Sequence, residues 1–110
     1  MSAYSKTYKL QRKSAVLLIF LVPWFLLKLL HFRGLSYSET VLALQNPTTA
    51  ILTALLLIVG FYHGYIGLNV ICNDYISSQK ARKITIGAIA IFLALSALLG
   101  CFCLGKLIVF

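Results

Sequence analysis

Long apolar stretches without charge constrain this chain more than any other feature. No charged residue lies between Ile84 and Gly105, and about 20 apolar residues suffice for a helix to cross the hydrocarbon core of a bilayer. Of the 110 residues, 61% are hydrophobic and 11% are charged. A soluble domain of this size has too little interior to hide that much apolar surface. The sequence therefore predicts an all-α membrane protein with a single domain, residues 1–110.

Three apolar stretches predict three transmembrane helices, at about residues 14–33, 47–72 and 82–106. The first follows a basic segment, as in a secretory signal, but no small-residue cleavage site follows it, so we expect a retained span. Pro23 predicts a kink in this span. Asn46 and Pro47 predict the start of the second span, as N-cap and first helical residue. The connection Gly34–Gln45 is expected to be a short loop or to hold an interfacial helix.

The charges are strongly unbalanced, with ten basic and two acidic residues and a net charge of +8. Because the basic residues flank apolar stretches, they predict contact with anionic lipid headgroups and no nucleic-acid partner. With three spans, the N-terminal tail and the second loop fall on one side of the membrane. That side receives Lys6, Lys9, Arg12, Lys13, Lys80, Arg82 and Lys83, and the other receives Lys28, Arg33 and Lys106. This bias predicts the N-terminus inside, in cytoplasm or matrix, and the C-terminus outside.

His63 is an ionisable residue inside the second apolar stretch, and such residues are costly in a membrane and commonly functional. Three roles remain open: a hydrogen bond to a neighbouring helix, proton relay, or ligation of a haem iron. At about 100° per residue, Gly60, His63, Gly67 and Asp74 share one face of the helix. A flat group such as a porphyrin could approach the backbone there. Close packing through Gly60-x-x-x-Gly64 explains the glycines equally well but leaves the histidine unexplained.

The second span ends with Asp74 and Tyr75 at the predicted inner interface. A carboxylate beside a phenol could hydrogen-bond the polar head of a ligand that arrives from the bilayer. In the alternative interpretation, Asp74 pairs with Lys80 or Arg82, and Tyr75 is an interfacial aromatic anchor. The residue types alone leave both interpretations open.

These residues together resemble a known family. The pattern His63-x-x-x-Gly67, followed by Asp74 and Tyr75 at the end of the second of three spans, is similar to the small membrane-anchor subunit of succinate dehydrogenase. That protein is the smaller, cytochrome b-type anchor of respiratory complex II. Residues 46–75 look most like its alphaproteobacterial and mitochondrial branch. The entry into the first span also has this character, in Arg12–Lys13–Ser14–Ala15 and Pro23–Trp24.

The resemblance implies specific roles. His63 would be an axial ligand of haem b, Tyr75 would hydrogen-bond a ubiquinone carbonyl, and Asp74 would support that site. The second haem histidine would come from a partner, because the only other histidine, His31, lies near the outer end of the first span. The implied partners are a second anchor subunit similar to cytochrome b556, an iron–sulfur subunit and a flavoprotein subunit. The implied location is a bacterial cytoplasmic or mitochondrial inner membrane.

In this interpretation the chain carries no catalytic residue, and electrons from succinate pass through flavin and iron–sulfur centres on other subunits to the quinone. A non-enzymatic three-span protein, such as a holin-like pore or an assembly factor, is the alternative from a different class. A fumarate reductase anchor is a second alternative, since the same pattern serves either direction of electron flow. A b-type haem spectrum in the purified complex would distinguish an anchor from a pore.

Overall fold

The chain is almost entirely helical. The computed structural model describes residues 2–109, and the side chains of all of these except residues 2–5 and 7. The helices are α1 (Ser2–Phe32), α2 (Tyr37–Gln45), α3 (Pro47–Tyr75) and α4 (Gln79–Val109), and residues 2–109 contain no strand. Three of these helices, α1, α3 and α4, are long and apolar enough to cross a membrane. The predicted all-α class with three candidate spans is confirmed.

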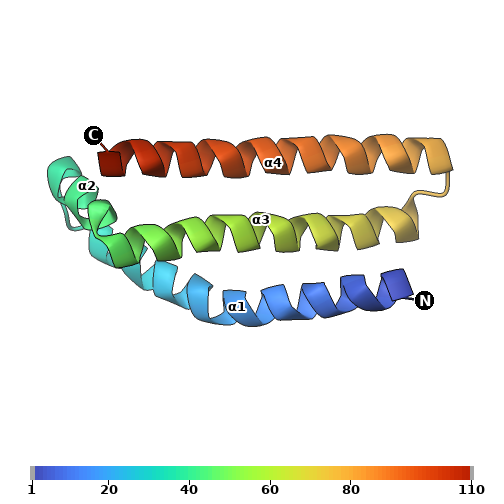
Figure 1. Ribbon diagram of the computed structural model, residues 1–110, viewed down its shortest axis with the longest axis horizontal. Coiled ribbons are helices and arrows are strands. Elements are labelled where there is room, and N and C mark those ends of the chain that lie inside the picture. The colour runs from blue at the N-terminus through green and yellow to red at the C-terminus, as the bar shows by residue number, and fades with distance from the viewer. Residues whose placement is uncertain (1, 110) are drawn as a thin grey trace.

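Helix α3 lies between α1 and α4 and packs against both (Figure 1). The molecule is elongated, with extents of 50 × 25 × 21 Å. The N-terminal end of α1 and the loop between α3 and α4 lie at one end, whereas α2 and the C-terminal end of α4 lie at the other (Figure 1). The tail and the second loop therefore share an end, as three spans require. The compartment that each end faces stays a prediction.

Helix α1 begins well before the expected span and remains helical through Pro23. Proline has no N–H to donate to the carbonyl one turn earlier, and it crowds that carbonyl. The helix changes direction in its second half, where it approaches α2 (Figure 1). This bend is the expected effect of a proline inside a membrane helix.

The connection after α1 is a helix, because its first turn is capped by a side-chain pair. The Glu39 backbone N–H donates to Ser36 Oγ at 3.2 Å, and the Ser36 N–H donates to Glu39 Oε1 at 3.4 Å. This reciprocal arrangement satisfies two N–H groups that a helix start otherwise leaves free. The other end of α2 is tied to α4, since Gln45 Nε2 donates to the Leu107 carbonyl at 2.7 Å.

Helix α3 begins at the predicted residues. Asn46 Oδ1 accepts hydrogen bonds from the N–H groups of Thr48 and Thr49, at 3.0 and 3.4 Å, and Pro47 occupies the first position. The free N–H groups at the helix start are thus satisfied by a side chain. At the other end, the Ile76 N–H donates to the Cys72 carbonyl at 3.0 Å, so the helix ends just after Tyr75.

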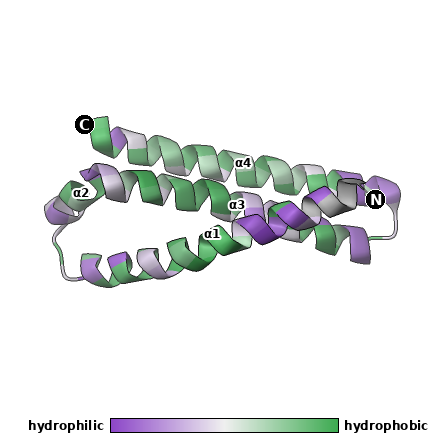
Figure 2. Ribbon diagram, turned by 60° about the horizontal axis from the view of Figure 1, so that its bottom comes forward, coloured by the Kyte–Doolittle hydropathy of each residue, from purple (hydrophilic) through white to green (hydrophobic). Residues whose placement is uncertain are grey.

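The three long helices bury little of one another. The buried hydrophobic residues are few: Leu21, Ala50, Ile66, Cys72 and Leu104. In the most apolar part of α4, no residue is buried. Hydrophobic residues occupy the middle of the molecule and hydrophilic residues gather toward its ends (Figure 2). Such an apolar surface requires lipid or a partner protein to cover it.

We predict that the end with the N-terminus and the second loop faces the inner compartment. In a variant whose three natural cysteines are replaced by alanine, single cysteines at Ser2 and Ser78 should react with a membrane-impermeant maleimide from the inner side only. A cysteine at Ser38 in α2 is the matched control and should react from the outer side only. Labelling of residues 2 and 78 from opposite sides would contradict the three-span topology.

Candidate functional site

His63 is in hydrogen-bond contact with the neighbouring helix α1. Its Nδ1 atom lies 2.7 Å from Ser14 Oγ. The Ser14 hydroxyl also donates to the carbonyl oxygen of Gln11, one turn earlier in α1, at 2.9 Å. Ser14 is only 6% exposed, so the packing of this chain alone shields its hydroxyl group from lipid. The imidazole is therefore held through one of its two nitrogens by a buried hydroxyl group.

The glycines beside His63 on α3 are only partly covered by the rest of the chain and are not tightly packed against it. A Cβ atom built on Gly60, Gly64 or Gly67 has no heavy atom within 4 Å outside the local helix backbone. Gly100 in α4 is different, because a Cβ there would lie 3.1 Å from a methyl carbon of Leu57. Close packing between helices of this chain therefore does not account for the glycines beside His63. They leave room for a group or a helix that this chain does not supply.

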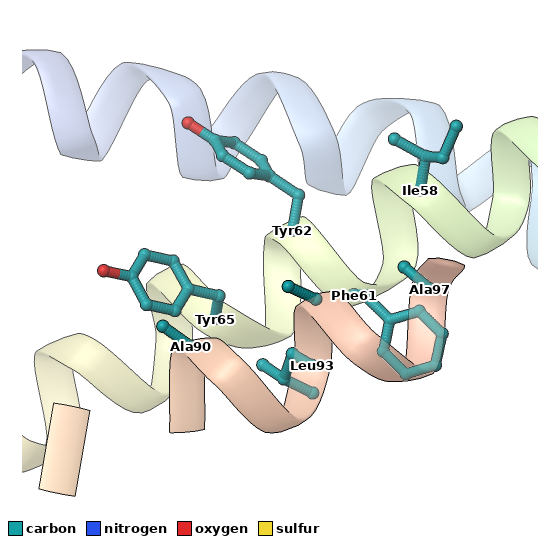
Figure 3. A pocket seen from close by; sticks show the side chains of 8 residues that line it. Ile58, Phe61, Tyr62, Tyr65, Ala90, Leu93 and Ala97 are labelled. Atoms are coloured by element: carbon teal, nitrogen blue, oxygen red, sulfur yellow. The ribbon is translucent and has the colours of Figure 1, made fainter. Parts of the chain in front are cut away.

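A groove with a volume of about 340 Å³ lies between α3 and α4. Figure 3 shows its lining, which is apolar apart from the hydroxyl groups of two tyrosines. The lining residues are Ile58, Phe61, Tyr62, Tyr65, Ala90, Leu93, Ala94 and Ala97. At about 100° per residue, the lining positions of α3 fall on the side of the helix away from His63. This groove is therefore separate from the glycine-lined face.

Asp74 and Tyr75 are exposed at the last turn of α3, where the side chain of Tyr75 is 82% exposed. Arg82, a candidate ion-pair partner of Asp74, donates from Nη1 to the Ile76 carbonyl at 3.2 Å instead. Among the described residues, the Asp74 side chain forms neither an ion pair nor a hydrogen bond. Both side chains are thus available to a ligand or partner at this end of the molecule.

The structure does not bring the end of α3 together with His63. At a rise of 1.5 Å per residue, Tyr75 lies about 18 Å further along the helix axis than His63. Asp74 shares the helix face of His63, and Tyr75 is turned by about 100° from Asp74 around the helix axis. The predicted residues therefore form two separate candidate sites on one helix.

Sequence reasoning missed the role of Ser14 as the partner of His63. The only available signal was a hydroxyl residue at the border between the basic segment and the first apolar stretch. Among the described residues, no group of three or more His, Cys, Asp or Glu side chains is placed to hold a metal ion. Any metal at His63 would thus need ligands from a cofactor or another chain.

The fold and the site define a class: a multi-pass helical membrane protein with one imidazole on an open helix face. Residues 3–99 match the model of the succinate dehydrogenase/fumarate reductase transmembrane subunit family. The match covers most of the chain and all three candidate spans but the end of α4. The chain belongs to this family, and the predicted resemblance is confirmed.

A curated relative supports the same assignment. The chain is 30% identical over 88 residues to the succinate dehydrogenase hydrophobic membrane anchor subunit of Rickettsia bellii (strain RML369-C). The aligned part is 80% of this chain and 70% of the relative. No solved structure matches the chain. Together with the three long apolar helices, these matches make the chain a multi-pass protein of a bacterial or mitochondrial inner membrane.

Proposed function

We propose that this chain is the small membrane anchor of succinate:quinone oxidoreductase, and that it supplies one axial ligand of haem b and part of the ubiquinone site. His63 is the proposed haem ligand, and Tyr75 with Asp74 forms this chain's part of the quinone site. The observation that carries the proposal is the placement of the histidine on an open, glycine-lined face, in a chain that belongs to this family.

The residues around His63 fit a haem group. Haem iron is commonly bound by a neutral imidazole nitrogen. The Ser14 hydroxyl engages Nδ1, so Nε2 is the nitrogen available to a metal. The absence of side chains at Gly60 and Gly67 leaves space beside the imidazole. When bound, the haem supplies a one-electron acceptor and donor within the membrane, with a potential set partly by its axial ligands.

The second axial ligand would come from the partner anchor, similar to cytochrome b556. Besides His63, the chain contains only His31. Ser14 contacts His63, and His31 lies about 26 Å further along α1 at 1.5 Å per residue. One iron cannot be bound by both histidines at that separation. This chain would therefore provide half of a shared haem site.

The exposed end of α3 suits the carbonyl end of a quinone. Ubiquinone is apolar apart from its oxygen substituents, so it would enter from lipid and present one carbonyl near the interface. The Tyr75 hydroxyl can donate a hydrogen bond to that oxygen, and such a bond strengthens where negative charge develops during reduction. Asp74 can accept a hydrogen bond from a neighbouring donor and thereby help to orient the groups that bind the quinone.

The same end of the molecule is the proposed docking surface for the iron–sulfur and flavoprotein subunits. It carries seven of the ten basic residues, at the start of α1 and of α4. In this assembly succinate is oxidised on the flavoprotein, and electrons reach the quinone beside Tyr75 through the iron–sulfur subunit. Family membership favours this anchor role over a holin-like pore or an assembly factor.

A fumarate reductase anchor is the second candidate, because the matching family description names both enzymes. The two functions use the same type of anchor and differ in the direction of electron flow. The name of the Rickettsia bellii relative favours succinate dehydrogenase. Comparison of succinate oxidation and fumarate reduction rates by the purified complex would separate them.

Replacement of His63 by alanine should remove or alter the b-type haem spectrum of the purified complex, because the iron loses a protein ligand. His31→Ala is the matched control and should leave the spectrum unchanged. The measurement is a reduced-minus-oxidised difference spectrum at equal complex concentration. An unchanged spectrum in His63→Ala would reject the haem assignment.

Enlargement of the open face should interfere with haem binding. We expect Gly67→Leu to lower the haem content per assembled complex, since the leucine would occupy the space beside His63. A Cβ atom added at Gly87 in α4 also meets no heavy atom within 4 Å, so Gly87→Leu is the matched control and should retain wild-type haem content. Equal haem content in the two variants would show that this face does not receive the haem.

The hydroxyl group of Tyr75 should support quinone reduction. A hydrogen bond of this kind contributes about 1 kcal/mol, so Tyr75→Phe should lower quinone reductase activity roughly fivefold or more. Succinate oxidation with an artificial acceptor that bypasses the quinone site should persist. Tyr62→Phe, which removes a hydroxyl from the α3–α4 groove, should have no such effect. A wild-type rate for Tyr75→Phe at matched assembly would leave Tyr75 as an interfacial anchor.

A further inference from the structure

We propose that Ser14 is a positioning residue for the haem ligand: its hydroxyl oxygen accepts a hydrogen bond from His63 Nδ1–H and thereby fixes the imidazole in the tautomer that can bind iron. This inference rests on the proposed haem ligation by His63. It deepens that proposal by assigning a role to a residue of a different helix.

The geometry restricts how the hydrogens are shared. A serine hydroxyl carries one hydrogen and can accept through its lone pairs. Ser14 Oγ lies 2.9 Å from the Gln11 carbonyl oxygen and 2.7 Å from His63 Nδ1. The carbonyl can only accept, so the hydroxyl hydrogen satisfies both contacts best when it points to Gln11. The hydrogen of the second contact then belongs to the imidazole, so Nδ1–H donates to Ser14 Oγ.

This arrangement selects the nitrogen that faces the metal. A neutral imidazole carries its hydrogen on one nitrogen and a lone pair on the other. With the hydrogen on Nδ1, the lone pair is on Nε2, as metal ligation through Nε2 requires. The opposite tautomer would carry a hydrogen on Nε2 and could not ligate through it. The bonds from Nδ1–H to Oγ and from the hydroxyl to Gln11 run in the same direction, which allows each to strengthen the other.

The support is built into the packing of α1 against α3. Ser14 is 6% exposed, and its hydroxyl is anchored to its own helix through Gln11. Ligand histidines in metalloproteins usually donate their second N–H to a fixed acceptor, and loss of that acceptor weakens metal binding. A bond that serves only to hold two helices together requires no particular tautomer of His63.

The test compares purified wild-type, Ser14→Ala and Ser14→Thr complexes in mild detergent. The first readout is the rate of haem transfer to an excess of an apo-globin acceptor, and the second is the haem midpoint potential. We expect Ser14→Ala to speed haem loss by about 10- to 100-fold and to raise the potential, because a less basic imidazole stabilises ferric iron less well. Ser14→Thr keeps the hydroxyl and should restore both values toward wild type. Ser96→Ala, which removes a serine hydroxyl bonded to the Phe92 carbonyl in α4, is the matched control and should change neither.

The outcomes separate this inference from the haem assignment. If His63→Ala loses the b-type spectrum while Ser14→Ala keeps wild-type haem loss and potential, the positioning role is wrong and the ligand assignment stands. Equal changes in Ser14→Ala and Ser14→Thr would also overturn it, since they would indicate packing alone. Should Ser14→Ala fail to assemble, Ser14→Cys provides a near-isosteric side chain with a weak acceptor. Faster haem loss in that variant supports the proposal, and wild-type behaviour overturns it.

Discussion

The hydrocarbon core of a membrane offers no hydrogen-bond partners, so each backbone N–H and C=O group within it must be satisfied inside the protein. This constraint accounts for the three long helices, whose backbone groups bond within each helix. The described residues form no extensive core, since they include no side chain that is fully buried. The backbone groups of the helices are hydrogen-bonded within each helix, but few side chains are buried between helices. This suits a subunit whose surface is covered by lipid and other subunits.

Within this apolar setting, the contact between Ser14 and His63 links two helices and a candidate cofactor site. Interhelical hydrogen bonds in membranes contribute only about 0.6 to 2 kcal/mol, so the bond alone gives a weak reason for a histidine at this position. The glycines Gly60 and Gly67 give a second reason, because this chain does not fill the space beside them. An imidazole held through one nitrogen, next to an unfilled face, is well suited to ligate a flat metal-containing group. The proposed quinone site at the exposed end of α3 is separate from His63, about 18 Å away along the helix.

The features that depend on local pattern are predictable from the sequence. Apolar stretches indicate the three candidate spans, and the Asn46–Pro47 pair indicates the start of α3. For the segment that forms α2, a loop and a helix both remained open, although Ser36 and Glu39 have the spacing of a capping box. The contact of Ser14 with His63 joins residues 49 positions apart, and no local pattern shows which turn of α1 meets which turn of α3. The glycine face of α3 follows from spacing, but only the structure shows that α1 and α4 leave it open.

The most direct test of this account is an electron cryomicroscopy structure of the assembled complex in a lipid nanodisc. We expect a haem whose iron is bound by His63 Nε2, with Nδ1 hydrogen-bonded to Ser14 and the haem edge beside Gly60 and Gly67. A haem bound without His63, or a helix of another protein filling the glycine face with no haem beside it, would contradict the central claim.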